Sequence, residues 1–257
     1  MYIDSHCHLN LLEFTQELPD LDSVLVQCRV EEIEHLLSVS TRLQDFQELL
    51  DIALSHSHIS ISAGIHPNEE EVNPEEYNIL LDQASNKKVI AIGETGLDYY
   101  RTEEKQDWQH ARFINHIEIA KKLQKPLIIH TRNASEDTIK LLKTHNARDA
   151  GGIMHCFTET WEVAKQALDL GFDISLSGIV TFKNATQIHE VAQKVPINRL
   201  LIETDCPYLA PVPLRGKANF PQYIKHTAAY IAQLRNIDIK VLANETTQNF
   251  YRLFKSD

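Results

Sequence analysis

The sequence is poor in cysteine, and none of its four cysteines forms a CxxC pair. Disulfides are therefore not expected, and the cysteines are expected to be reduced thiols in a reducing compartment. No apolar run approaches the roughly 20 residues that cross a bilayer, and the first residues lack the basic and apolar regions of a signal peptide. These absences predict a cytoplasmic protein without a membrane span.

Positive charge is also scarce, since 25 Lys and Arg stand against 36 Asp and Glu and the formal net charge is −11. A field of this sign repels nucleic acid and acidic membranes at long range, which argues against a protein that coats a duplex. An enzyme that admits one phosphodiester into a pocket is still compatible, because bound metal ions dominate the local field. With 43% hydrophobic and 24% charged residues, the composition is otherwise that of an ordinary folded domain.

The chain has no low-complexity stretch, no Gly/Ser linker and no step in composition, so we expect one domain over residues 1–257. Short windows rich in Ile, Val and Leu have the composition of buried parallel strands. These windows are 2–8, 33–40, 59–65, 89–94, 126–130, 152–157, 172–177 and 199–205.

Segments of helical period separate the windows. Apolar residues recur at helical spacing over 113–120 and 188–195, and further helices are expected over 222–235 and 239–254. The sequence Asn73-Pro74-Glu75-Glu76 predicts a helix start with Asn73 as its N-cap. Strands and helices that alternate in this way over about 250 residues are typical of a TIM-type (β/α)8 barrel in the α/β class. A doubly wound open sheet is the alternative, but its Gly-rich dinucleotide turn is missing.

The 13 histidines are unevenly placed. Eight of them fall mostly in helical or polar stretches, where a solvated side chain is expected. These are His35, His56, His58, His110, His116, His145, His189 and His226. The others stand at or beside the C-terminal ends of predicted strands: His6, His8, His66, His130 and His155. In a barrel this is the end that carries catalysis.

His6 and His8 are two residues apart on a strand, so they project from the same face and can hold one metal ion together. An HxH pair alone is equally compatible with two core histidines. Four further strand ends carry suitable side chains, namely Glu94, His130, His155 and Asp205. This set exceeds the needs of one four-coordinate ion. Because a carboxylate can bridge two cations about 3.5 to 4 Å apart, Glu94 is the expected bridge.

Alternation along the strands also assigns the neighbours of these residues. Cys7, Cys156 and Cys206 each adjoin a proposed ligand, so they are expected to point outward as small buried hydrophobes. Asp4 and Glu203 share the faces of ligand candidates. They are expected to orient imidazoles or a water molecule from behind the ligands.

The same residues lie in motifs that resemble the TatD family of metal-dependent deoxyribonucleases and hydrolases. The motifs are YIDSHCHLN at 2–10, GIHP at 64–67, IGETGLDYY at 92–100, PLIIHTRNASED at 126–137, MHCF at 154–157 and LLIETDCPYLAPVPLRGKAN at 200–219. The resemblance covers essentially the whole chain. It implies a TIM-type barrel, two divalent cations and phosphodiester hydrolysis, with 3′ to 5′ exonuclease action on DNA.

Matched residue by residue, the resemblance implies two cation sites that share one carboxylate. One site consists of His6, His8, Glu94 and Asp205, and the other of Glu94, His130 and His155. Histidine and carboxylate ligands suit Zn²⁺, Mn²⁺ and, less well, Mg²⁺.

The candidates for substrate contact are His66, Arg132, Tyr99, Arg215 and Lys217. His66 can donate to a phosphate oxygen or serve as a turn histidine. Arg132 suits bidentate phosphate binding or an ion pair with the nearby acids at 136 and 137. Tyr99, like the tyrosine after it, can stack an unpaired base or simply pack. Arg215 and Lys217 suggest a phosphate-facing lid after the last strand.

The leading hypothesis is a two-metal hydrolase that acts on DNA ends or a small phosphodiester, with no obligate protein partner evident. Asp205 would accept a proton from water, and Glu94 and Glu203 would complete the catalytic group. A cyclic-amide hydrolase is the first alternative, but Glu94 stands where those barrels usually carry a carboxylated lysine. A non-catalytic metal-dependent binding protein is the second, and it would not need six ligands and a proton acceptor.

Overall fold

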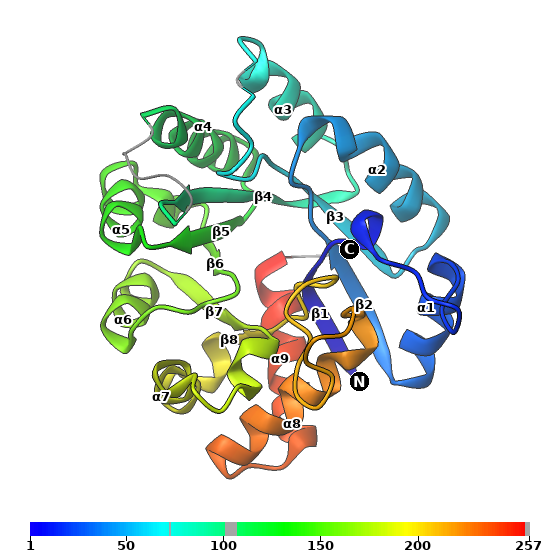
Figure 1. The fold of residues 1–257 in the computed structure, drawn as a ribbon. Coiled ribbons are helices and arrows are strands. Elements are labelled where there is room, and N and C mark those ends of the chain that lie inside the picture. The colour runs from blue at the N-terminus through cyan, green and yellow to red at the C-terminus, as the bar shows by residue number, and fades with distance from the viewer. Residues whose placement is uncertain (72, 101–106, 255–257) are drawn as a thin grey trace.

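The computed structural model describes residues 1–71, 73–100 and 107–254, and within them the strands form one eight-stranded parallel sheet in sequence order. The strands are β1 (Tyr2–Cys7), β2 (Ile33–Ser38), β3 (Ile59–Ala63), β4 (Val89–Asp98), β5 (Leu127–Arg132), β6 (Gly152–Met154), β7 (Phe172–Leu176) and β8 (Leu200–Ile202). Each pairs in parallel with the next along the chain. The predicted (β/α)8 barrel is confirmed (Figure 1).

The strands are short and buried along their length, as strands covered on both faces must be. Every residue of β3 and of β7 is buried. Strand β4 extends four residues beyond the predicted window, to Asp98. Strands β6 and β8 end early, at Met154 and Ile202, so the site candidates that follow them stand in loops.

The seam between β1 and β8 closes the barrel without a ladder pair in the part of the chain that the structure describes. Asp205 N donates to His6 O at 2.9 Å, and His8 N donates to Cys206 O at 2.9 Å. Below them, Ser5 Oγ donates to Ile202 O at 2.9 Å. These bonds hold the HxH segment beside the loop that carries Asp205.

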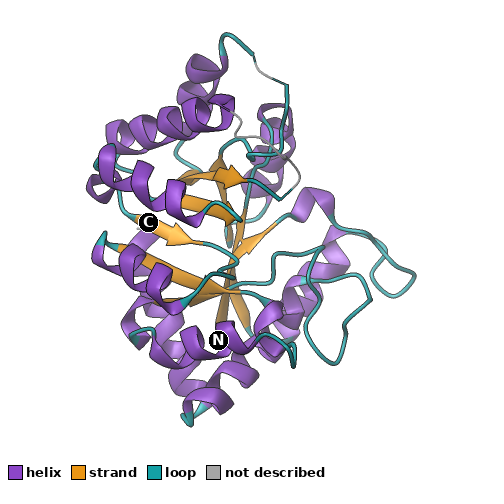
Figure 2. Cartoon of the chain, turned by 60° about the vertical axis from the view of Figure 1, so that its left-hand side comes forward, coloured by secondary structure: helices purple, strands orange, loops and turns teal. Residues whose placement is uncertain are grey.

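Helices surround the strands (Figure 2). They are α1 (Leu21–Val30), α2 (Phe46–Ser55), α3 (Glu76–Ala84), α4 (Asp107–Leu123), α5 (Ser135–Thr144), α6 (Trp161–Asp169), α7 (Thr186–Lys194), α8 (Ile224–Arg235) and α9 (Ile239–Phe254). The periodicity predicted over 113–120 and 188–195 is confirmed by the buried faces of α4 and α7. Of the helices described, none has the length and apolarity that a membrane span requires.

Two local predictions are wrong. Helix α3 begins at Glu76, and Asn73 instead closes a turn ahead of it, where Asn73 Oδ1 accepts from Glu75 N at 2.9 Å. His35 and His116 were expected in solvent but are buried. His35 Nε2 lies 3.0 Å from Ser60 Oγ, and both ring nitrogens of His116 bond backbone groups. A satisfied imidazole can be buried at little cost.

One buried carboxylate lies at the end of the barrel opposite the strand C-termini. Asp173, fully buried near the start of β7, accepts from Arg199 and Arg252 through separate oxygens. We expect Asp173→Ala to lower the free energy of unfolding by about 1.5 to 3 kcal/mol, because it removes the hydrogen bonds that two partly exposed arginines make to a charged group. Urea denaturation measures this. Lys194→Ala, which breaks the exposed Lys194–Glu190 pair and the contact of Lys194 Nζ with the Trp161 ring at 5.6 Å, is the control, with an expected loss below about 1 kcal/mol. Equal stability of the two variants would contradict the role of Asp173.

Candidate metal centre

The predicted ligand candidates converge at the C-terminal end of the barrel. They come from five places around the rim: His6 and His8 at the end of β1, Glu94 in β4, His130 in β5, His155 just after β6 and Asp205 after β8. All except His130 are buried, and the His130 side chain is 18% exposed. The strand-end residues identified in the sequence therefore surround one opening, at the C-terminal end of the barrel, which is called the mouth below.

The first donor cluster joins β1, β4 and the loop after β8. His6 Nε2 lies 3.2 Å from His8 Nε2, 3.4 Å from Glu94 Oε2 and 3.5 Å from Asp205 Oδ1. His8 Nε2 lies 3.8 Å from Glu94 Oε2 and 3.4 Å from Asp205 Oδ1. Ligands about 2.0 to 2.1 Å from a tetrahedral zinc ion stand about 3.3 to 3.4 Å from one another. The donor spacing therefore fits a divalent cation.

The second donor cluster uses the other oxygen of Glu94. Glu94 Oε1 lies 2.7 Å from His155 Nε2, 3.0 Å from His130 Nδ1 and 3.4 Å from His66 Nε2. His155 Nε2 is buried and makes no hydrogen bond despite the short distance. An unpartnered nitrogen that faces a carboxylate at this distance is what a shared cation would resolve. Glu94 thus presents one oxygen to each cluster.

Hydrogen bonds fix which ring nitrogen is free to bind. His8 Nδ1 lies 2.9 Å from Val39 O and His155 Nδ1 lies 3.3 Å from Glu203 Oε1, so each donates its proton away from the mouth. Their Nε2 atoms keep lone pairs for a cation. His66 has the opposite arrangement, because Asn68 N donates to its Nδ1 at 3.0 Å. Its Nε2 therefore carries the proton and is a donor rather than a ligand.

The carboxylates of the ligand candidates Glu94 and Asp205 are both held in their charged form. Burial alone would raise the pKa of Glu94, but the imidazoles of His155 and His66 hold it well below its usual value. Burial likewise opposes ionisation of Asp205, and the nearby imidazoles of His8 and His6 lower its pKa. Glu94 and Asp205 therefore offer ionised carboxylate oxygens to the mouth.

The two residues expected behind the ligands behave differently. Glu203 contacts His155, accepts from Cys156 N at 2.7 Å, and leaves its Oε2 buried without a hydrogen-bond partner. Asp4 orients no imidazole. It accepts from the amide and hydroxyl of Thr204 and from His6 N at 3.3 Å, so it ties β1 to the loop after β8.

The cysteines follow the prediction in two cases of three. Cys7 and Cys206 are buried in the apolar core. Cys156 is partly exposed, and its Sγ lies 3.2 Å from Ser177 Oγ. The alternation rule fails for Cys156 because β6 ends at Met154 and the cysteine has a φ of 41°.

Of the substrate-contact candidates, Tyr99 is engaged inside the protein. Its hydroxyl donates to Asp137 Oδ2 at 3.0 Å and pairs with His110 Nε2. Tyr100 is the exposed member of the pair, at 60%, and the Arg132 guanidinium lies 3.6 Å from its ring centroid. An aromatic ring with a stacked guanidinium is a suitable platform for a base and its phosphate.

The two basic residues after β8 are both exposed. The Arg215 guanidinium lies 4.3 Å from the centroid of the Phe182 ring, and Lys217 stands two residues further along the same loop. Both remain candidates for phosphate contact on grounds of charge and exposure.

Sequence reasoning missed Asp98. Its Oδ2 lies 3.1 Å from His130 Nε2 and accepts from Asn68 Nδ2 at 3.0 Å, while its Oδ1 accepts from Tyr100 N at 2.9 Å. It fixes His130 from behind, as carboxylates commonly do for metal-binding histidines. Alternation from Glu94 would have found it if the strand had been extended to residue 98.

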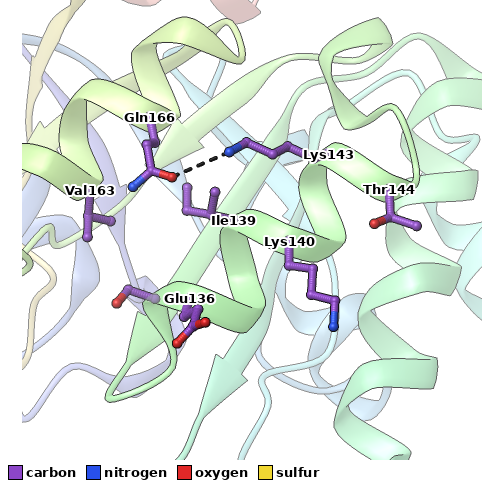
Figure 3. A pocket seen from close by; sticks show the side chains of 8 residues that line it. Glu136, Ile139, Lys140, Lys143, Thr144, Val163 and Gln166 are labelled. Carbon is purple, nitrogen blue, oxygen red and sulfur yellow. Dashed lines mark hydrogen bonds between the residues drawn. The ribbon is translucent and has the colours of Figure 1, made fainter.

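A separate groove of about 510 Å³ lies on the outer surface between α5 and α6. Figure 3 shows Ile139, Lys143 and Gln166 around it, with Lys143 Nζ 3.4 Å from Gln166 Oε1. None of the ligand or substrate-contact candidates lines it.

Comparisons with known proteins match this chain to one family over nearly its whole length. Residues 3–255 match the family model described as TatD related DNase. An uncharacterized metal-dependent hydrolase of Escherichia coli K12, YcfH, is 44% identical over 255 residues, which cover 99% of this chain and 96% of that protein. Its counterpart YabD of Bacillus subtilis is 38% identical over 256 residues and covers 99% of each chain. The crystal structure of YJJV, a TatD homolog from Escherichia coli K12, superposes with a TM-score of 0.92 at 25% identity, over 100% of this chain and 98% of that one.

Proposed function

The chain belongs to the TatD-related DNase family of metal-dependent hydrolases, and from that premise we propose that it cleaves phosphodiester bonds, as a 3′ to 5′ exonuclease on single-stranded DNA ends. The observation that carries this proposal is the double role of Glu94. Its Oε2 lies 3.4 Å from His6 Nε2, and its Oε1 lies 2.7 Å from His155 Nε2. One carboxylate between two donor clusters can hold the two neighbouring cations that two-metal hydrolysis uses.

In this proposal His6, His8, Glu94 and Asp205 hold one divalent cation, and Glu94, His130 and His155 hold the other. Bound divalent cations supply positive charge that acidifies water and neutralises phosphoryl oxygens. Zn²⁺ and Mn²⁺ suit the mixed histidine and carboxylate donors best, and Mg²⁺ less well. Glu203 supports the second site because it holds His155 by its Nδ1.

Proton transfer from water and binding of the phosphate are carried out by side chains of this protein. Asp205, with a side chain 13% exposed against 4% for Glu94, faces the mouth and is the proton acceptor for the attacking water. His66 donates from Nε2 to a phosphate oxygen, and Arg132 binds the phosphate while Tyr100 stacks the adjoining base. Arg215 and Lys217 add positive charge from the loop after β8.

The test strips the protein with a chelator, restores Zn²⁺, Mn²⁺ or Mg²⁺ singly, and assays four substrates in parallel. These are single-stranded DNA, duplex DNA, bis(4-nitrophenyl) phosphate and a cyclic amide. We expect metal-dependent release of nucleotides from the single strand and hydrolysis of the chromogenic diester. Turnover of the amide alone would overturn the proposal.

The acidic surface predicts how DNA is handled. With a net charge of −11, the protein can release few counterions, and each phosphate neutralised on a single strand contributes only about −0.7 to the slope of log affinity against log salt. We therefore expect a shallow slope and cleavage of free single-stranded ends in preference to closed circles, since duplex interior must first be unpaired and unstacked. Affinity measured over a salt series tests this. Efficient nicking of closed duplex circles, or a slope steeper than about −4, would contradict it.

A further inference from the structure

Helix α4 carries polar residues where a barrel helix ordinarily buries apolar ones. Gln109, Arg112 and His116 are only 1%, 3% and 0% exposed. Spacings of three and four place them on one side of the helix. Buried polar groups are costly unless they are bonded, so the partners of this α4 polar face show what it does.

All three residues bond the backbone of the loop that follows β3, which carries His66. His116 Nε2 accepts from Ile65 N at 3.1 Å, and Gln109 Nε2 donates to Pro67 O at 3.0 Å. These two bonds fall on the residues immediately before and after His66. Further along, Arg112 donates to the carbonyls of Glu69 and Glu71. The α4 polar face therefore brackets His66 from both sides.

The polar face is itself held in place. Arg112 donates twice to the Glu76 carboxylate at the start of α3, at 2.9 Å each. His116 Nδ1 donates to Arg112 O at 2.8 Å, which leaves Nε2 as the acceptor that the Ile65 amide requires. Burial lowers the pKa of His116 to about 4, so the ring stays neutral and keeps this acceptor.

The same face reaches the end of β4. Gln109 Oε1 accepts from Asp98 N at 3.1 Å, and its Nε2 also lies 3.3 Å from Asp98 O. The Asp98 carboxylate in turn holds His130 Nε2 at 3.1 Å. The buried amide of Gln109 thus joins the loop that carries His66 to the end of β4, where Asp98 holds the ring of His130.

We propose that Gln109, Arg112 and His116 are positioning residues that set where His66 and His130 stand in the mouth. The inference rests on the proposed function, in which His66 contacts the phosphate and His130 holds a cation. The polar face touches neither reacting group directly. Its effect passes through the backbone of the loop and through Asp98.

The His66 side of the inference is tested with two variants of His116. His116→Leu removes the acceptor for Ile65 N, so we expect the KM for bis(4-nitrophenyl) phosphate to rise about 5- to 10-fold, the effect of one lost hydrogen bond. The kcat should change less than the KM, since the ligand set is untouched. His116→Gln, whose Oε1 can take the place of Nε2, should restore most of the affinity. A normal KM for His116→Leu, or no rescue by His116→Gln, would overturn this half.

The His130 side is tested with Gln109→Met, which keeps the size of the side chain and removes its hydrogen bonds. A calorimetric Zn²⁺ titration should show one of two sites weakened, by less than the 10- to 100-fold that is usual when the direct partner of a metal ligand, here Asp98, is lost. If Gln109→Met does not fold, Gln109→Asn, whose amide is one methylene short of Asp98 N, takes its place with the same expected direction. Two sites of unchanged affinity would overturn this half.

Ile119→Val is the matched control, because Ile119 is fully buried on the same helix and belongs to the apolar core. It should lower the Tm without changing the KM or the Zn²⁺ affinity. If it changes them as the polar variants do, general loosening of α4 accounts for the effects and the positioning role fails. A wild-type protein that binds no Zn²⁺ or leaves the diester intact contradicts the proposed function instead, so the two failures are distinguishable.

Discussion

Asp205→Asn is expected to lower turnover by about 10² to 10⁴-fold, the usual range for the loss of a general base. The amide keeps the shape of the side chain but has neither the charge nor the basicity to accept a proton. Backbone disruption should be small, because Asp205 has a φ of 56°, and Asn adopts this left-handed conformation readily. Steady-state hydrolysis of bis(4-nitrophenyl) phosphate at saturating metal measures the loss.

Asp205 is also a ligand candidate, with its Oδ1 3.5 Å from His6 Nε2 and 3.4 Å from His8 Nε2. Excess metal separates the two roles. His130→Ala is the comparison, since it removes a ligand candidate without removing the proton acceptor, and excess metal should partly restore its activity. If excess metal restores Asp205→Asn completely, Asp205 is a ligand only and another group accepts the proton.

The fold was predictable because its signals are local. Eight buried runs and the helical periods between them identify a barrel. The barrel rule then selects the chemistry-bearing residues at strand ends, and His6 and Asp205 do meet across the seam although 199 positions separate them in sequence. Where strands ended was less predictable. The alternation rule misplaced Cys156, because β6 stops two residues before it.

The support behind the site was not predictable, because it depends on contacts that have no period. His116 has the sequence context of a solvated helix residue, yet its partner Ile65 lies 51 positions earlier. Asp98 was missed because the strand was expected to end at residue 94, whereas β4 has ten residues and ends at Asp98. Ring tautomers are equally hidden, since they depend on single partners such as Val39 O for His8 and Asn68 N for His66.

Glu94→Gln is expected to have the second large effect, on metal content. The wild-type protein should hold about two ions per chain after reconstitution with Zn²⁺ or Mn²⁺, as a two-metal centre requires. In the variant one carboxylate oxygen becomes an amide nitrogen, which has no lone pair to offer, and the negative charge shared by both clusters is lost. Both sites should weaken by more than about 10²-fold, the upper limit usual for partners that only support a ligand.

Metal analysis after gel filtration measures this loss, and Glu190→Gln is the control, because it removes the same charge from an exposed position on α7. The pattern of loss is as informative as its size. A carboxylate that serves one cluster would, when neutralised, empty one site and leave the other filled. A bridge empties both, since Oε2 faces His6 and His8 while Oε1 faces His130 and His155. Full metal content with normal turnover in Glu94→Gln would therefore refute the bridge, and a loss of one ion alone would reduce Glu94 to a ligand of a single cation.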